Sequence, residues 1–238
     1  MIVDVDNPDT WPSGVAKIVA TCVANFQGRD TSLSDLATEA GRLDAEIGLL
    51  LAGHRLRAYH CTRLLDREVA RIQAEGLHPS SERLRQDKLS AARANGDLTD
   101  DQYAILQRSQ TVGDLYGLKT FSRIHLFTST LELESHLSEL ASYLTYWGGE
   151  ALFDGTAGLR EVLGGLGRPA IICAGLDVEQ IRGIDESLTA PFVATIAQWP
   201  PEHRGAVVRY GAAIPGDDIE AIWRPGDPAY DRFPGLPR

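Results

Sequence analysis

Cysteine and long apolar runs are scarce in this sequence, and each shortage excludes a class of protein. Only three cysteines occur among 238 residues, at positions 22, 61 and 173, too few and too far apart for a disulfide framework or a zinc signature. No apolar stretch approaches the roughly 18 residues that a membrane-spanning helix needs. The acidic, proline-containing N-terminus does not resemble a secretory signal or a transit peptide. We therefore expect a cytoplasmic protein that does not contact a membrane.

Common catalytic motifs are missing as well. The sequence has no Walker loop, no GxSxG elbow, no HExxH pair and no GxGxxG after a predicted strand. His, Cys and Asp do not recur at ligand spacing, so we expect no metal site. The net charge of −10, from 33 acidic and 23 basic residues, disfavours a nucleic-acid scaffold. An enzyme that reaches nucleic acid through a local basic patch stays open.

The apolar spacing in the first 54 residues predicts an N-terminal helical extension. Apolar residues recur at helical spacing from Val15 to Phe26, and a second apolar stripe runs from Leu33 to Leu50. Each stripe has the width that a helix buries against a neighbouring layer. We expect these helices to cover a sheet formed by the rest of the chain.

Residues 55–238 mix strand and helix patterns and predict a second unit. Strands are predicted at 56–62, 124–128, 169–175, 192–196 and 206–210, with a weaker candidate at 150–153. One helix is expected from Asp66 to Gly76, and a leucine-striped helix is expected to begin with Thr130 as its cap. A polar stretch at about 80–117 predicts a helical insertion that contains two helices. Helices followed by mixed strands and helices predict the α+β class.

The most informative segment is Tyr59-His60-Cys61-Thr62-Arg63. Because alternate side chains of a strand share a face, His60 and Thr62 point the same way, toward one cleft. Ile72 and the pair Gly76-Leu77 follow at the end of the next predicted helix. With these residues the sequence resembles ADP-ribosyltransferases of the diphtheria-toxin and poly-ADP-ribose-polymerase type. Their first core strand carries Tyr-His-Gly-Thr, so Cys61 departs from the usual glycine.

The resemblance continues with the family's second element, a strand with an aromatic residue and Ser or Thr, then a helix with a tyrosine. Phe127-Thr128-Ser129 and then Tyr143 or Tyr146 fit that order. The resemblance thus spans Tyr59 to Tyr146 and leaves out the N-terminal helices and the C-terminal tail. It implies a split mixed β-sheet core of ADP-ribosyltransferase type.

The resemblance also implies NAD as the substrate and a role for each matching residue. His60 would hold the adenosine-side ribose with support from Thr62, and the backbone at Cys61 would bind the nicotinamide amide. Tyr143 or Tyr146 would stack on the nicotinamide, and Phe127 or Tyr59 would form a second wall. Arg63 could hold a phosphate of NAD.

Such an enzyme needs a carboxylate beside the ribose, and two glutamates are candidates. Glu150 follows Trp147-Gly148-Gly149, where a tight turn would present it to a cleft. Glu202 precedes the 206–210 strand, nearer to the family's catalytic glutamate, and the Ile214-Pro215 downstream of it also matches the family. We favour Glu150, because a tryptophan, two glycines and an acid in sequence serve no obvious packing need.

Three functions follow, from different classes. The first is an NAD-dependent ADP-ribosyltransferase that modifies a protein, nucleic acid or small molecule, or an NAD glycohydrolase. The resemblance allows a toxin or defence role, with a cognate inhibitor protein as a partner. The second is an inactive module of the same fold that binds NAD, ADP-ribose or a protein. The third is a helical interaction protein in which His60 is structural, as most strand histidines are, and in which Tyr143 and Tyr146 are ordinary half-buried helix residues.

Overall fold

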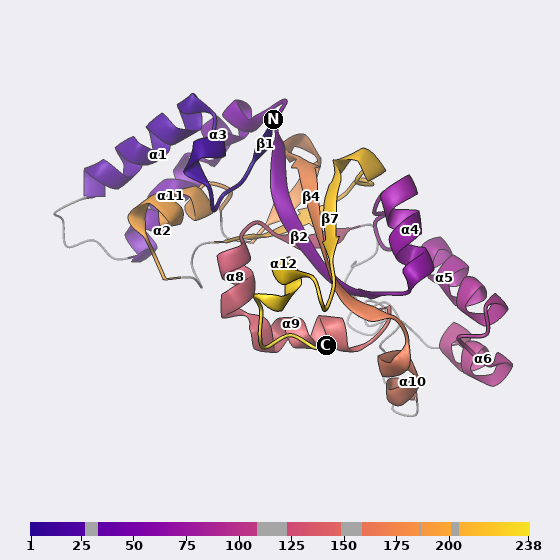
Figure 1. Cartoon of the computed structure of the whole chain (residues 1–238). Coiled ribbons are helices and arrows are strands. Elements are labelled where there is room, and N and C mark those ends of the chain that lie inside the picture. The colour runs from indigo at the N-terminus through magenta and orange to yellow at the C-terminus, as the bar shows by residue number, and fades with distance from the viewer. Residues whose placement is uncertain (27–32, 109–122, 149–158, 186, 201–204) are drawn as a thin grey trace.

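The computed structural model describes residues 1–26, 33–108, 123–148, 159–185, 187–200 and 205–238 (Figure 1). The strands are β1 (Ile2–Val3), β2 (Arg55–Leu64), β3 (Ile124–Phe127), β4 (Arg168–Asp177), β5 (Ile181–Ile184), β6 (Val207–Tyr210) and β7 (Ile219–Trp223). The helices are α1 (Ser13–Phe26), α2 (Leu33–Arg42), α3 (Asp44–Leu51), α4 (Asp66–Glu75), α5 (Glu82–Ala94), α6 (Asp100–Arg108), α8 (Thr130–Ser135), α9 (Leu137–Thr145), α10 (Arg160–Gly165), α11 (Ala190–Ala197) and α12 (Pro228–Asp231).

The described strands form one sheet in the order β5-β6-β3-β2-β4-β7, and β1 pairs with β2 outside this path. β1 runs parallel to β2, and the other pairs are antiparallel. The predicted α+β class is confirmed. A single register pair, Tyr59–Phe127, joins β2 to β3, and the described strands form one connected sheet.

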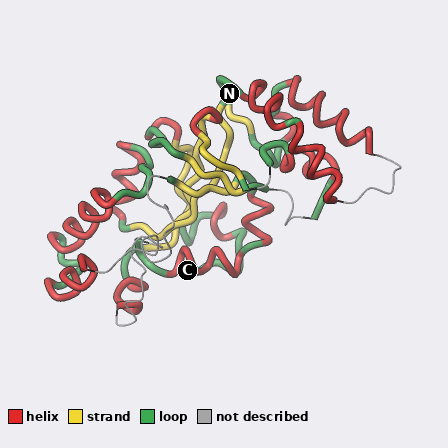
Figure 2. The backbone as a smooth tube through the Cα atoms, turned by 180° about the vertical axis from the view of Figure 1, so that it is seen from behind, coloured by secondary structure: helices red, strands yellow, loops and turns green. Residues whose placement is uncertain are grey.

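The N-terminal helices share one hydrophobic core with the sheet. Val15 and Ile47 pack in the same buried cluster as Leu126 of β3 and Phe192 of α11. The Trp11 and Phe192 rings meet edge to face at 5.0 Å between centroids. Figures 1 and 2 show α1, α2, α3 and α11 together at one side of the sheet, with α4, α5 and α6 at the opposite side. The described residues of the N-terminal segment, 1–26 and 33–54, therefore pack into the body of the protein.

Several predicted elements need correction. The predicted strand at 192–196 is the helix α11, whose first turn contains Pro191, a position where the missing N–H costs nothing. The stripe from 33 to 50 divides into α2 and α3 with a break at Leu43, and the leucine-striped helix divides into α8 and α9. Ser129, and not Thr130, caps α8. The predicted strand at 150–153 lies outside the described residues.

The predicted pair of polar helices is confirmed as α5 and α6, and they enclose a small core of their own. Leu89 and Leu106 are fully buried in a cluster with Trp147 and Leu163. The C-terminal tail also contributes to the core, since Tyr230, Phe233 and Leu236 pack in one buried cluster with Tyr59 and Leu140. Both segments thus help to fix the elements around β2.

Candidate functional site

One edge of β2 lacks a strand partner where the predicted site residues lie. β4 pairs with the other edge from Arg55 to Leu64. On this edge β1 reaches only Arg55 and Leu56, and β3 pairs only at Tyr59, so residues 60–64 face no described strand. Unpaired strand edges present backbone N–H and C=O groups to whatever lies beside them.

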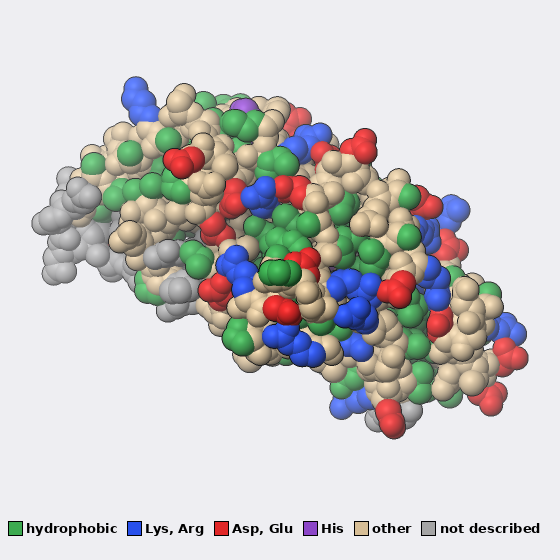
Figure 3. Space-filling view, viewed as in Figure 1, with side chains coloured by type: hydrophobic (Ala, Val, Ile, Leu, Met, Phe, Trp, Pro, Cys, Tyr) green, Lys and Arg blue, Asp and Glu red, His purple; other side chains and the backbone are tan. Residues whose placement is uncertain are grey.

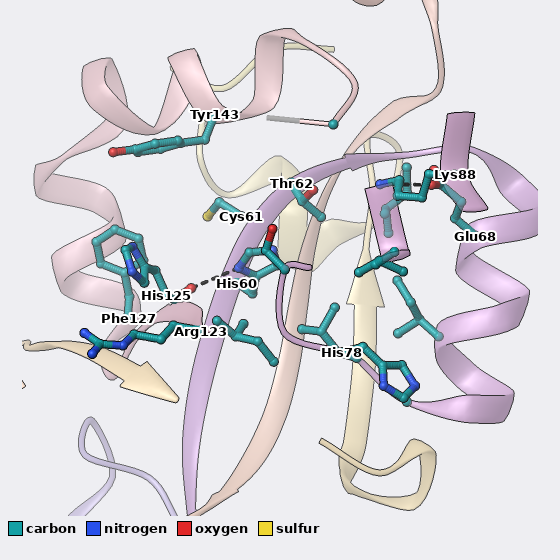
Figure 4. Close-up of a pocket in the computed structure, with 18 of the residues that line it drawn as sticks. His60, Cys61, Thr62, Glu68, His78, Lys88, Arg123, His125, Phe127 and Tyr143 are labelled. Atoms are coloured by element: carbon teal, nitrogen blue, oxygen red, sulfur yellow. Dashed lines mark hydrogen bonds and ion pairs between the residues drawn. The ribbon is translucent and has the colours of Figure 1, made fainter. Parts of the chain in front are cut away.

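A cavity of about 540 Å³ lies along this open edge. Its walls come from β2, α4 and the turn after it, α5, β3, α8 and α9. Three successive residues, His60, Cys61 and Thr62, line it, whereas a cavity over one face of a strand would meet only alternate residues. Figure 4 shows His60 and Thr62 between two walls, with Phe127, His125 and Tyr143 on one side and Lys88, Glu68 and His78 on the other.

His60 bridges the gap between β2 and β3. Its Nδ1 lies 2.9 Å from the carbonyl oxygen of His125. Because a carbonyl oxygen only accepts, we assign the proton to Nδ1, which leaves Nε2 as an acceptor. Burial lowers the pKa of His60 below its ordinary value, and the hydrogen bond to His125 opposes that shift only in part. The ring is therefore neutral at neutral pH, with one hydrogen-bond acceptor for a ligand.

Five of the sequence-predicted residues meet at this cavity. They are His60, Cys61, Thr62, Phe127 and Tyr143. Tyr143 is 39% exposed and lines the cavity. Burial raises the pKa of the Cys61 thiol to about 12, which keeps it protonated. Cys61 thus serves as a small apolar wall next to the strand edge, and not as a nucleophile.

Three other predicted residues lie elsewhere. Tyr59 is 3% exposed and packs its ring against Trp223, 5.5 Å between centroids, within a buried cluster. Arg63 donates to the carbonyl oxygens of Leu166 and Leu144, and so joins the ends of two helices. Tyr146 packs with the cluster around Trp147. None of the three lines the cavity.

Glu150 and Glu202, the two predicted catalytic carboxylates, lie outside the described residues. Described neighbours of both reach the cavity, however. Gly148, two residues before Glu150, lines it with φ +86°, and Val207, five residues after Glu202, lines it at the start of β6.

The cavity is richer in positive groups than the chain as a whole. Among the described lining residues, four are Arg or Lys (Arg71, Arg85, Lys88, Arg123) and three are acidic (Glu68, Glu132, Asp185), in a protein of net charge −10. Three of these cations pair with acidic side chains: Lys88 with Glu68, Arg71 with Glu75 and Arg85 with Glu82. On the face shown in Figure 3, basic and acidic side chains are mixed.

Glu68 holds one wall of the cavity together. Its carboxylate accepts from the Leu65 N–H at 2.8 Å and from Trp147 Nε1 at 2.7 Å, and it pairs with Lys88 at 3.0 Å. These contacts fasten α4 to α5 and to the fully buried Trp147. Because all three contacts are made within the protein, Glu68 acts as a structural carboxylate.

Sequence reasoning missed several lining residues. His78, His125 and His136 join His60 there, so four of the six histidines surround one cavity. Glu68, Lys88 and Glu132 were also missed, since a single charge on a helix carries no signal of the cavity beside it. His78 directly follows the Gly76-Leu77 turn, and His125 lies in the predicted strand that carries Phe127.

Neither a metal site nor a membrane span is found in the part of the chain that the structure describes. No group of three or more His, Cys, Asp or Glu side chains there is arranged to hold a metal ion, and no helix there is long and apolar enough to cross a bilayer. Comparison with known proteins gives no match to a family model, a curated protein or a solved structure. The functional interpretation therefore depends on the cavity itself.

Proposed function

We propose that this protein binds NAD in the cavity beside β2, cleaves its nicotinamide glycosidic bond and transfers ADP-ribose to an acceptor. The observation that carries the proposal is the meeting of His60, Thr62, Phe127 and Tyr143 at one cavity along an open strand edge. β2, β3 and α9 carry these residues in the order that the ADP-ribosyltransferase resemblance implies.

The cavity suits the parts of NAD chemically. Its volume of about 540 Å³ lies in the range that small-molecule sites occupy. The acceptor Nε2 of neutral His60 can take a ribose hydroxyl, and the open edge of β2 offers backbone groups to the nicotinamide amide. The rings of Tyr143 and Phe127 line the cavity and can stack on the cationic nicotinamide. Lys88 and Arg71, which pair with Glu68 and Glu75, also line it and can attract the pyrophosphate.

The reaction needs little covalent work from the protein. The bond between C1′ of the ribose and the nicotinamide nitrogen breaks, and its electron pair passes to the ring, which becomes neutral nicotinamide. The ribosyl cation left behind is oxocarbenium-like and is stabilised by a nearby carboxylate. An oxygen or nitrogen of the acceptor adds to C1′ and loses its proton. If the acceptor is a protein, nucleic acid or small molecule, the product is that molecule carrying ADP-ribose. If the acceptor is water, the product is free ADP-ribose.

The test is nicotinamide release from NAD by the purified protein, with and without cell lysate as a source of acceptor. We expect release by the wild type and loss of most activity in His60→Ala. Glu150→Gln and Glu202→Gln test the two carboxylates outside the described residues. The proposal fails if the wild type releases no nicotinamide and labelled NAD modifies nothing in the lysate.

A binding module without catalysis is the second candidate. The observation that favours it is Cys61, which places a side chain where the resembled family has glycine at the nicotinamide edge. Such a module would gain thermal stability from NAD or ADP-ribose by mass action and would release no nicotinamide. A helical interaction protein would show neither effect.

A further inference from the structure

Histidines gather around the cavity beside β2 from four separate parts of the fold. His60 belongs to β2, His78 follows the turn after α4, His125 belongs to β3, and His136 ends α8. Figure 4 shows His125 on one wall, His78 on the other and His60 between them. Histidine is the side chain whose ordinary pKa, about 6.5, puts its change of charge between pH 5 and 8. The charge of this cavity therefore depends on pH within the physiological range.

Backbone carbonyl groups hold one nitrogen of two of these rings. His60 Nδ1 lies 2.9 Å from the His125 carbonyl oxygen, and His136 Nδ1 lies 3.1 Å from the Glu132 carbonyl oxygen. Since a carbonyl oxygen only accepts, Nδ1 carries the proton in both neutral rings. A further proton therefore goes to Nε2, and the ring then becomes a cation that donates a hydrogen bond instead of accepting one.

Most of the other charges around the histidines are paired within the protein. From the helices α4 and α5, Arg71 pairs with Glu75 at 2.8 Å, Arg85 with Glu82 at 3.2 Å and Lys88 with Glu68 at 3.0 Å, and after β5, Asp185 pairs with Arg209 at 3.0 Å. The remaining charged or titratable lining groups of the described chain are Cys61, Arg123, Glu132 and Tyr143. Because each pair offsets its own charge, protons on the histidines alter the balance of the cavity.

His60 resists protonation more than an ordinary histidine does. Burial lowers its pKa, and the positive charges of His125 and Lys88 lower it further. Cations that line one cavity thus repel each other, and an anion bound among them offsets that repulsion. Binding of an anion then raises the pKa of the surrounding histidines and draws protons from solution. We expect these protons on His78, His125 and His136, while His60 stays neutral.

We infer that the cavity binds a ligand with a pyrophosphate group together with protons, which His78, His125 and His136 take up, so that affinity rises as the pH falls. The inference rests on the proposed function for the pyrophosphate, which is the anionic part of NAD. It does not require the protein to cleave the glycosidic bond. The fixed charges of Lys88 and Arg71 attract the ligand at every pH, and the histidines add a charge that appears only in acid.

The test is isothermal titration calorimetry of the purified protein with ADP-ribose at pH 6, 7 and 8, in two buffers whose heats of ionisation differ. ADP-ribose keeps the charge of its pyrophosphate over this range and has no nicotinamide bond to cleave. We expect Kd to be about tenfold or more lower at pH 6 than at pH 8. At pH 7, each histidine whose pKa rises by about one unit from 6.5 should take up about half a proton.

A triple variant assigns the protons to these side chains. His78→Gln, His125→Gln and His136→Gln together should leave the Kd for ADP-ribose nearly independent of pH and should abolish most of the proton uptake. His54→Gln, which changes a histidine that does not line the cavity, should behave like the wild type. If the triple variant does not fold, the single changes at the exposed His78 and His125 should each lower the uptake.

Three results would overturn the inference: no binding of ADP-ribose at pH 6, binding without proton uptake, or uptake that the histidine variants leave unchanged. Nicotinamide release from NAD, measured separately, tests the proposed function. A protein that takes up protons with ADP-ribose but leaves NAD intact keeps this inference and refutes the proposed cleavage. A protein that releases nicotinamide and binds ADP-ribose without proton uptake does the reverse.

Discussion

His60 donates from Nδ1 to the His125 carbonyl oxygen at 2.9 Å, and burial lowers its pKa. The fold thus keeps the imidazole neutral, whereas the unfolded chain protonates it below about pH 6.5, the ordinary pKa of histidine. At a pH between the lowered pKa of His60 in the folded protein and about 6.5, the unfolded chain binds a proton on His60 that the folded protein does not. His60 therefore makes the protein less stable as the pH falls.

We predict that the free energy of unfolding of His60→Gln loses part of this pH dependence. Glutamine can still donate to the His125 carbonyl oxygen, but it does not titrate. Urea unfolding of the wild type and the variant, on either side of about pH 6.5, measures how the free energy of unfolding of each changes with pH. The other histidines are present in both proteins, so their contributions cancel in the comparison. The wild type should lose more stability on acidification. Equal losses in the two proteins would show that the native pKa of His60 is not lowered.

The sequence predicted part of the site because some residues sit in a short local pattern. His60, Thr62, Phe127 and Tyr143 lie at the cavity as the pattern indicated. Tyr59 instead packs against Trp223 in a buried cluster. Glu68 and Lys88 could not be predicted, since their place depends on how α4 packs against α5 and Trp147.

At the scale of elements, the turn after α4 shapes one side of the cavity. Gly76 ends α4 with φ +92°, and its N–H donates to the Ile72 carbonyl oxygen at 2.8 Å. Leu77 then exchanges hydrogen bonds with Ile214 at 2.9 and 2.8 Å. Together these contacts direct Leu77 and His78 into the cavity wall.

Gly76→Ala should destabilise the protein by about 2 kcal/mol or more, for two reasons. The positive φ at residue 76 is strained for alanine, and the added Cβ atom would clash with a neighbouring carbonyl group. A Cβ atom there would lie 2.1 Å from the Ile214 carbonyl oxygen. The matched control is Gly96→Ala, with φ +78° and nothing within 4 Å of the added atom, which should cost only about 1 kcal/mol from backbone strain. Denaturant unfolding measures both, and equal losses would contradict the close contact.

The link between α4, α5 and Trp147 gives a second prediction for elements. Glu68→Ala removes the acceptor of the buried Trp147 Nε1 and the partner of Lys88, which should cost about 2–3 kcal/mol. Glu75→Ala on the same helix removes only an exposed pair with Arg71 and should change stability by less than about 0.5 kcal/mol. Thermal or denaturant unfolding of the two variants distinguishes them, and a small loss in Glu68→Ala would contradict the link.

Most helices and strands were predictable from local periodicity. The wrong predictions fall where packing against distant residues decides between helix and strand. The apolar run 192–196 fits either a buried strand or a buried helix, and Pro191 with the packing against Trp11 makes it a helix. The short strands β1, β5 and β7 were missed, because two to five residues at a sheet edge carry little pattern. Long stripes were divided at Leu43 and His136, where no proline or glycine marks the break.

At the scale of the whole molecule, the N-terminal residues are part of the core. β1 pairs with β2, and Asp4 pairs with Arg57 at 2.7 Å. Asp6 accepts a hydrogen bond from the Thr130 N–H at the start of α8. We predict that a protein beginning at residue 55 does not fold on its own, because it exposes the surface that α1 and α3 cover on Leu126 and Phe192. Circular dichroism and binding of a hydrophobic dye measure this. A cooperative melting transition in the shortened protein would contradict a shared core.

The whole molecule holds a cavity along the open edge of β2, lined by His60, Phe127 and Tyr143. Nicotinamide release by the purified protein is the most direct measurement of the proposed function. We expect steady release by the wild type, with strong loss in His60→Ala. The contrary result is a wild-type protein that leaves NAD intact and whose melting temperature does not change when NAD is added.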